Sequence, residues 1–197
     1  MNLPETFEMP IEYRRVSFSK RLAAWLIDSA TGIIVGLLLG LMAIGVEIVN
    51  ISMMDPATLS ELQDAYASLG LERSLATDLF VTLQAVSAGI IITTMLLSLL
   101  ELFIGASIGK LTLGLEVAHM DGRRGNVQLW AKRWLVKNLA TLFALIGLLP
   151  VFEFLGTIGS LIGLVITIGC FFALGKDRLA LHDRIAQTAV FRKEDLQ

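Results

Sequence analysis

A run of apolar residues without a single charge, from Leu79 to Leu100, places the strongest limit on how this chain folds. A helix needs about 20 mostly apolar residues to cross the hydrocarbon core of a bilayer. A second long run, from Leu22 to Val46, contains one charge, Asp28. Charged residues make up only 17% of the chain, whereas a soluble domain has about a quarter. The sequence therefore predicts an all-α membrane protein.

Four transmembrane helices are expected, arranged as two hairpins. Two further apolar runs lie on either side of Pro150, and proline interrupts a helix because it lacks an amide donor. One helix through both runs would be about 60 Å long, twice the hydrocarbon thickness, so a hairpin is favoured. We expect one domain over residues 1–197, with spans at about 22–46, 79–102, 134–151 and 154–175, an outer loop at 47–78, an inner loop at 105–133 and a tail at 176–197.

The basic residues orient these spans, because Lys and Arg accumulate in cytoplasmic loops. Of the 16 Lys and Arg residues, only Arg73 lies between the first and second spans. The others lie in three regions: before the first span, between the second span and the mouth of the third, and after the fourth. Both termini are then expected on the cytoplasmic side.

Several function classes are disfavoured by composition. The net charge of −2 gives no basic excess to follow phosphates, so we expect no nucleic acid partner. One cysteine, Cys170, and two histidines, His119 and His182, are too few for a Cys/His zinc site. No nucleophile has a recognisable base beside it, so we expect neither an enzyme nor a cofactor.

Each loop contains one predicted element. In the outer loop, Asp55-Pro56 is typical of a helix start, and apolar residues follow at helical spacing as far as Gly70. A short amphipathic helix is expected there. In the inner loop, apolar residues alternate from Leu113 to Val117, and Asp121-Gly122 favours a turn, which together predict a short strand or hairpin.

The first span contains a stripe of small residues and a buried charge. Gly32, Gly36 and Gly40 recur every four residues and form one groove for close helix packing. Arg21 and Asp28 lie on the same face. A carboxylate facing lipid costs about 2.5–3.5 kcal/mol, so Asp28 should face the bundle and have a partner.

Two interpretations of these charges stay open. Asp28 is either a cation or proton site tuned by Arg21, or one half of a buried pair that fixes helix register. Glu101 either joins the same polar cluster or marks the membrane interface, and the interface is favoured. The C-terminal tail mixes charged and apolar residues, and we expect a short helix and a polar network at the inner mouth that includes Lys110, His182 and Arg184.

Three blocks in order resemble the RDD family of multi-pass membrane proteins, which is named for one arginine and two aspartates. The first is Lys20-Arg-Leu-Ala-Ala-Trp-Leu-Ile-Asp28. The second is Gly105-Ala-Ser-Ile-Gly-Lys110 with Gly114-Leu-Glu-Val117 and Asp121-Gly122. The third is Leu181-His-Asp183-Arg-Ile-Ala-Gln-Thr188. The resemblance covers the chain from about Phe18 to Val190.

The resemblance implies that Arg21, Asp28 and Asp183 are the naming triad. Lys137 stands where an arginine is usual, Gln187 where a glycine is usual, and Ser107 where a threonine is usual. It also implies a bacterial inner-membrane protein that transports a small ligand or cation, with cation/proton exchange suggested for some members.

Four helices are few for a transport pathway, so we expect a homodimer or higher homo-oligomer, packed through the first-span glycines and in contact with membrane lipid. The alternative is a non-transporting scaffold or accessory subunit that docks a membrane protein partner at its cytoplasmic face.

Overall fold

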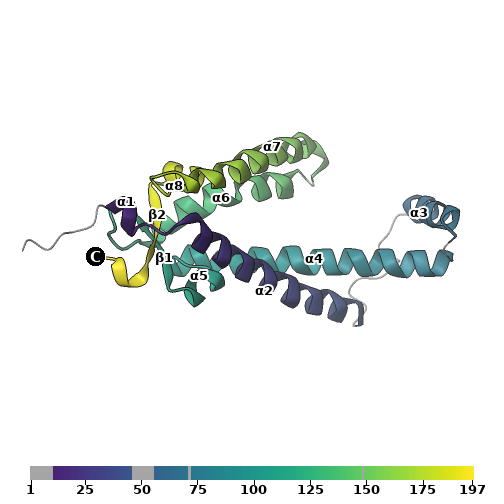
Figure 1. Cartoon of the computed structure of the whole chain (residues 1–197). Coiled ribbons are helices and arrows are strands. Elements are labelled where there is room, and N and C mark those ends of the chain that lie inside the picture. The colour runs from purple at the N-terminus through teal and green to yellow at the C-terminus, as the bar shows by residue number, and fades with distance from the viewer. Residues whose placement is uncertain (1–10, 46–55, 71, 148) are drawn as a thin grey trace, which may run out of the picture. The chain divides into compact units, whose positions relative to one another are not determined.

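The computed structural model describes residues 11–45, 56–70, 72–147 and 149–197 (Figure 1). The chain divides into two compact units, Asp28–Leu97 and the combination of Met1–Ile27 with Ser98–Gln197. The elements in chain order are α1 (Ile11–Arg14), α2 (Phe18–Gly45), α3 (Pro56–Ser68), α4 (Arg73–Ile104), α5 (Ile108–Thr112), β1 (Leu115–His119), α6 (Val127–Ile146), η2 (Pro150–Phe152), α7 (Glu153–Cys170), η3 (Phe171–Leu174), α8 (Leu181–Ala186), β2 (Thr188–Arg192) and η4 (Lys193–Asp195).

Three helical segments in the described part of the chain are long and apolar enough to cross a membrane: Phe18–Gly45, Thr77–Ile104 and Glu153–Leu174. They correspond to the first, second and fourth predicted spans. The third predicted span, 134–151, has the wrong bounds, because α6 begins at Val127 and ends at Ile146. It carries three basic residues, Lys132, Arg133 and Lys137, so α6 is less apolar than the other three. The count of four spans therefore stays a prediction.

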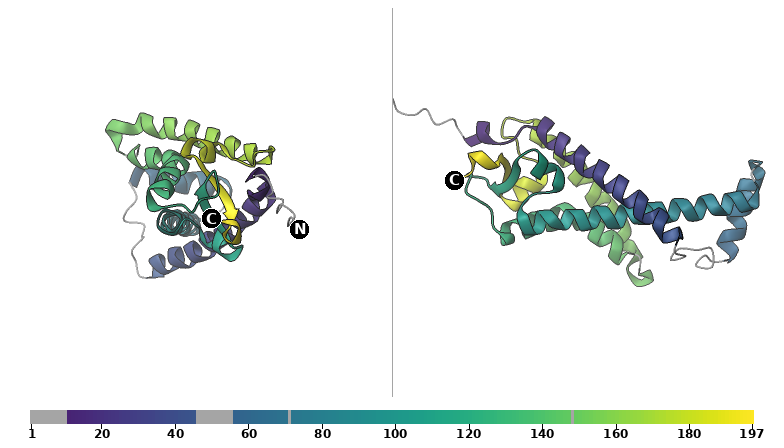
Figure 2. Two further views of the ribbon diagram at one scale, coloured as in Figure 1. Left: turned by 90° about the vertical axis from the view of Figure 1, so that its left-hand side faces the viewer. Right: turned by 90° about the horizontal axis from the view of Figure 1, so that it is seen from below.

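The predicted hairpin around Pro150 is confirmed. Helix α6 ends at Ile146, the 3-10 turn η2 follows, and α7 begins at Glu153. The two helices run side by side in every view (Figures 1 and 2). A Cβ at Gly159 would lie 2.8 Å from the Ala140 carbonyl oxygen, so glycine on α7 lets the helices approach closely.

The glycine groove of the first span is confirmed as a packing surface, but its partner is α4 of the same chain. Gly36 faces the backbone of Gly89 and Ile90, and a Cβ at Gly40 would lie 2.6 Å from the Val86 Cα. The expectation that these glycines pack against a second copy is therefore wrong, because α4 already covers them. The homo-oligomer itself stays a prediction.

Exchanging Gly36 for alanine is expected to destabilise the α2–α4 contact by about 1–3 kcal/mol, because the new methyl group overlaps backbone that has no room to move. Its Cβ would lie 2.6 Å from the Ile90 amide nitrogen. Gly45→Ala is the control: nothing lies within 4 Å of a Cβ there, so the higher helix propensity of alanine should leave stability equal or slightly raised. Thermal unfolding in detergent micelles measures both, and equal midpoints would contradict the packing.

The predicted outer-loop helix is confirmed as α3. Its expected N-cap, Asp55, lies outside the described residues. Gly70 follows with a φ of +79°, a conformation that suits glycine at a helix end. No α3 side chain is buried, and Gln63 donates a hydrogen bond of 3.1 Å to the Thr77 hydroxyl on α4.

The predicted inner-loop strand is confirmed as β1, but it does not form a local hairpin. It pairs antiparallel with β2 from the C-terminal tail, with Val117 opposite Val190. Both valines and Phe191 are at most 1% exposed. The end of the tail is therefore part of a small core, because the run Thr188–Phe191 is too apolar to stay in water.

Gln187 connects α8 to β2 in a left-handed conformation, with a φ of +58°. This conformation costs a residue with a Cβ about 1–2 kcal/mol of folded-state stability, and glycine avoids that cost. Glycine also makes the unfolded chain more flexible, which cancels part of the gain. We expect Gln187→Gly to raise the free energy of unfolding by about 0.5–1 kcal/mol. Gln187→Ala, which keeps the Cβ, should leave it nearly unchanged. Denaturant titration distinguishes the two, and equal effects would contradict the role of backbone strain.

Candidate functional site

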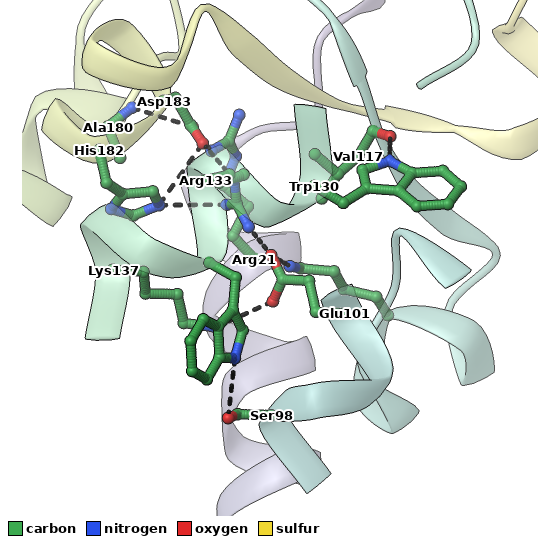
Figure 3. Close-up of polar contacts among 12 residues, drawn as sticks. Arg21, Ser98, Glu101, Val117, Trp130, Arg133, Lys137, Ala180, His182 and Asp183 are labelled. Carbon is green, nitrogen blue, oxygen red and sulfur yellow. Dashed lines mark hydrogen bonds and ion pairs between the residues drawn. The ribbon is translucent and has the colours of Figure 1, made fainter. Parts of the chain in front are cut away.

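The carboxylate of Glu101 is the centre of a buried group of charges (Figure 3). Glu101 lies near the end of α4 and is 1% exposed. Its Oε1 lies 2.9 Å from the Lys110 Nζ and also pairs with the Arg133 guanidinium, and its Oε2 accepts a hydrogen bond of 2.9 Å from the Lys137 Nζ. Three cations from α5 and α6 thus offset the cost of burying one carboxylate. Glu101 therefore belongs to the polar cluster, and its position at the membrane interface stays a prediction.

Asp183 is the second buried carboxylate, on α8, and it is fully covered. It accepts hydrogen bonds from the guanidinium of Arg21, from the Arg133 Nε at 3.0 Å and from the backbone amide of Ala180 at 3.2 Å. Burial alone would raise the pKa of Asp183, but the positive charges of Arg133 and Arg21 outweigh it and hold the pKa well below its usual value. Asp183 therefore stays ionised at any physiological pH.

Arg133 joins the two carboxylates. Its Nη1 pairs with Glu101, its Nε donates to Asp183, and its side chain is 4% exposed. Its sequence context does not distinguish it from the other basic residues at the mouth of the span. A usable signal was its spacing: Trp130, Arg133 and Lys137 share one face of a helix, so two cations and an aromatic ring point to the same side.

Arg21 reaches the group from the start of α2. Besides its pairing with Asp183, it donates to the carbonyl oxygens of Val16 at 3.2 Å and Arg178 at 2.7 Å. Asp28 is half-buried on α2 and is the first residue of the other compact unit. The expected pairing of Arg21 with Asp28 stays a prediction.

The predicted inner-mouth network is found in part. Lys110 and His182 belong to the group around Glu101 and Asp183, and Gly109 brings α5 against the Ala24 backbone of α2. Arg184 does not belong to it: its side chain is 49% exposed and pairs with Asp177 at 3.1 Å. Successive residues of a helix differ by about 100° in direction, so His182 and Asp183 point inward on α8 while Arg184 points to solvent.

His182 is held neutral. Its Nε2 lies 3.1 Å from the Arg133 Nη2 and 3.4 Å from the Asp183 Oδ1. A guanidinium can only donate, so Nε2 accepts from Arg133 and the ring proton is on Nδ1. Burial, and then the charge of Arg133, lower the pKa of His182 to about 3. Nδ1 has no hydrogen-bond partner among the residues that the structure describes.

His182 should make the folded state sensitive to mild acid. The unfolded chain takes up a proton near pH 6.5 and the folded chain only near pH 3, so stability falls as pH drops through this interval. The slope of the free energy of unfolding against pH approaches about 1.4 kcal/mol per pH unit. In His182→Gln, whose amide oxygen can still accept from Arg133, this slope should disappear. Denaturant titration from pH 7 to 4 measures it, and parallel curves for the two proteins would contradict the burial of a neutral imidazole.

The group is a network of buried ion pairs. Within the described residues, no three His, Cys, Asp or Glu side chains gather into a metal site. Each of the two carboxylates, Glu101 and Asp183, is bound by more than one cation (Figure 3).

The comparison with protein families identifies the family of this chain. The sequence model of the RDD family matches residues 15–187. The chain belongs to the RDD family. No curated protein and no solved structure matches it.

Two members of the RDD triad that the resemblance implied, Arg21 and Asp183, form an ion pair in this protein. Lys137, at the position where an arginine is usual, keeps a contact with Glu101. As a lysine it offers a single point charge and not the planar fork of a guanidinium. The RDD protein is thus a membrane protein whose described residues include three apolar helices of spanning length and a buried charge network.

Proposed function

We propose that this RDD protein transports a small cation across the membrane in exchange for protons, and that Glu101 is a coupling carboxylate. The position of Glu101 carries the proposal. It is an ionisable group inside a candidate span, Thr77–Ile104, and is almost completely buried. Charges within spans are costly, and where they occur they typically belong to ion pathways or proton relays.

The exposures of the cations around Glu101 indicate where exchange would occur. The side chain of Lys137 is 37% exposed, against 11% for Lys110 and 4% for Arg133. A cation or a proton that arrives from water would therefore displace Lys137 first, while Arg133 and Lys110 stay in place. Lysine suits this role because its long flexible side chain releases a partner more easily than a bidentate guanidinium does.

Asp183 has a different role in the proposal. Its pKa lies far below physiological pH, so it does not release or take up protons during a transport cycle. It would instead anchor Arg133 and Arg21 and keep the inner end of the pathway closed. Asp28, half-buried in the span formed by α2, would be a second cation or proton site.

The proposed setting is a bacterial plasma membrane with four spans, α6 included, and both termini in the cytoplasm. The distribution of Lys and Arg supports it. We further propose a homo-oligomer. Because α4 occupies the glycine face of α2, a second copy would pack against another face.

The proposal is tested by cation-driven proton flux in proteoliposomes. Glu101→Gln and Asp28→Asn are compared with wild type and with Asp121→Asn, a control that removes an exposed carboxylate paired with Arg123 on the surface. Flux is expected in wild type and in the control and should be lost in Glu101→Gln and Asp28→Asn, with folding matched by thermal unfolding. Full flux in folded Glu101→Gln would contradict its coupling role.

A second candidate function is a non-transporting scaffold, and one observation favours it. The strands and the segments around them have buried cores of their own, which include Val117, Val190, Phe191 and Leu179. A packed platform next to the spans is suited to docking a membrane protein partner. In that case Asp28→Asn would lower stability or remove a co-purifying protein, and no variant would affect ion flux.

A further inference from the structure

A basic surface pocket lies outside the charge network, next to the start of the first span. It has a volume of about 530 Å³ and is lined by Lys20, Leu113, Gly114, Arg192, Lys193 and Glu194. Three cations and one carboxylate give it a net positive charge. The side chains of Lys20, Arg192 and Lys193 are all exposed, so they are accessible to a ligand.

Three segments that are far apart in the sequence build this pocket. The Lys193 amide donates a 2.9 Å hydrogen bond to the Gly114 carbonyl oxygen, which fixes the end of β2 to the loop after α5. The Val16 amide donates a 2.8 Å hydrogen bond to the Val190 carbonyl oxygen, and Arg15 forms an isolated antiparallel β-bridge with Phe191. These bonds place the residues that lead into α2 beside β2. The backbone of the pocket is therefore fixed before any ligand binds.

The segment that lines the pocket also carries exposed apolar side chains. Lys20 lies in the first turn of α2, whose candidate span begins at Phe18. Leu113, which lines the pocket, and Leu111 in the preceding helix α5 are 39% and 52% exposed. A group of cations beside exposed leucines, at the level where a span enters the membrane, combines the two surfaces that an anionic phospholipid presents: a phosphate and an acyl chain.

We propose that this pocket binds the phosphate headgroup of an anionic phospholipid, with Lys20, Arg192 and Lys193 as its contacts and the leucines against the acyl chains. Arg192 also pairs with Glu194 at 3.2 Å, an exposed ion pair. Such a pair is weak in water, so a phosphate can replace Glu194 as the partner of Arg192. The headgroup would fix the end of the tail strand to the membrane surface.

The test uses the full chain in phosphatidylcholine nanodiscs that contain spin-labelled phosphatidylglycerol, with spin-labelled phosphatidylcholine as the reference lipid. The bound fraction of each label gives the preference for the anionic headgroup. The pocket variant carries Lys20→Gln, Arg192→Gln and Lys193→Gln. The control carries Arg123→Gln, Arg124→Gln and Lys132→Gln, which removes the same charge from exposed residues outside the pocket.

Wild type and the control should bind phosphatidylglycerol in preference to phosphatidylcholine. In the pocket variant, the ratio of bound phosphatidylglycerol to bound phosphatidylcholine should fall by about fivefold or more. An equal loss in the control would assign the effect to general surface charge and overturn the proposal, as would a wild type without any preference. A further arm adds inorganic phosphate at constant ionic strength. Release of the labelled lipid by inorganic phosphate would identify a site for free phosphate and overturn the lipid assignment.

Discussion

Replacing Arg133 by methionine is expected to lower the free energy of unfolding by about 3–5 kcal/mol. The guanidinium serves Glu101 and Asp183 at once, and its side chain is 4% exposed. Methionine fills a similar volume but leaves both carboxylates short of a buried partner. Chemical unfolding in detergent micelles measures the loss.

The neighbouring residue supplies the control for this experiment. Lys132 lies on the same helix but is exposed, so Lys132→Met should change stability by no more than about 0.5 kcal/mol. If Arg133→Met were as stable as Lys132→Met, the network would contribute nothing to the fold. The interpretation of Arg133 as the link between the two carboxylates would then be wrong.

Asp183→Asn is expected to lower the free energy of unfolding by about 3 kcal/mol at neutral pH, because Arg21 and Arg133 would lose the charge that compensates their burial. The folded-state pKa of Asp183 is depressed, so the stability it contributes is fully present above the ordinary pKa of about 4 and is lost only as the pH falls below that value. The difference in the free energy of unfolding between wild type and Asp183→Asn should therefore stay constant from pH 5 to 8 and become smaller in stronger acid.

A surface carboxylate gives the comparison. Asp121 pairs with Arg123 at 2.7 Å, but both side chains are more than half exposed. Asp121→Asn should change stability by less than about 1 kcal/mol, since exposed ion pairs are weak. A loss in Asp121→Asn as large as that in Asp183→Asn would mean that burial does not determine the strength of these pairs.

The apolar runs predicted most of the helical structure because the information is local. A span needs a continuous stretch of apolar residues, and the runs that contain Leu22 and Leu79 became α2 and α4 with bounds shifted by a few residues. The glycine repeat in α2 also predicted a close helix contact. It could not predict which helix fills the groove, because Gly89 of α4 contributes to the contact from more than 40 positions away.

The strand pairing and the centre of the charge network were not predictable in the same way. Alternation marked β1, but its partner Thr188–Arg192 comes from the end of the chain, and no local turn connects the two. The burial of Arg133 was not predictable either, because an arginine at the end of an apolar run typically extends to the lipid headgroups. Its burial depends on carboxylates supplied by α4 and α8, which only the tertiary fold brings together.

Cation-driven proton movement by the wild-type protein is the most direct test of the proposed function. Proteoliposomes with an acidic interior and a pH-sensitive dye are diluted into buffer, and a monovalent cation is added outside. The account predicts that the interior becomes less acidic faster than in protein-free vesicles, and that the rate saturates with cation concentration. Identical traces from vesicles with and without the protein, with the protein shown to be inserted and folded, would contradict transport.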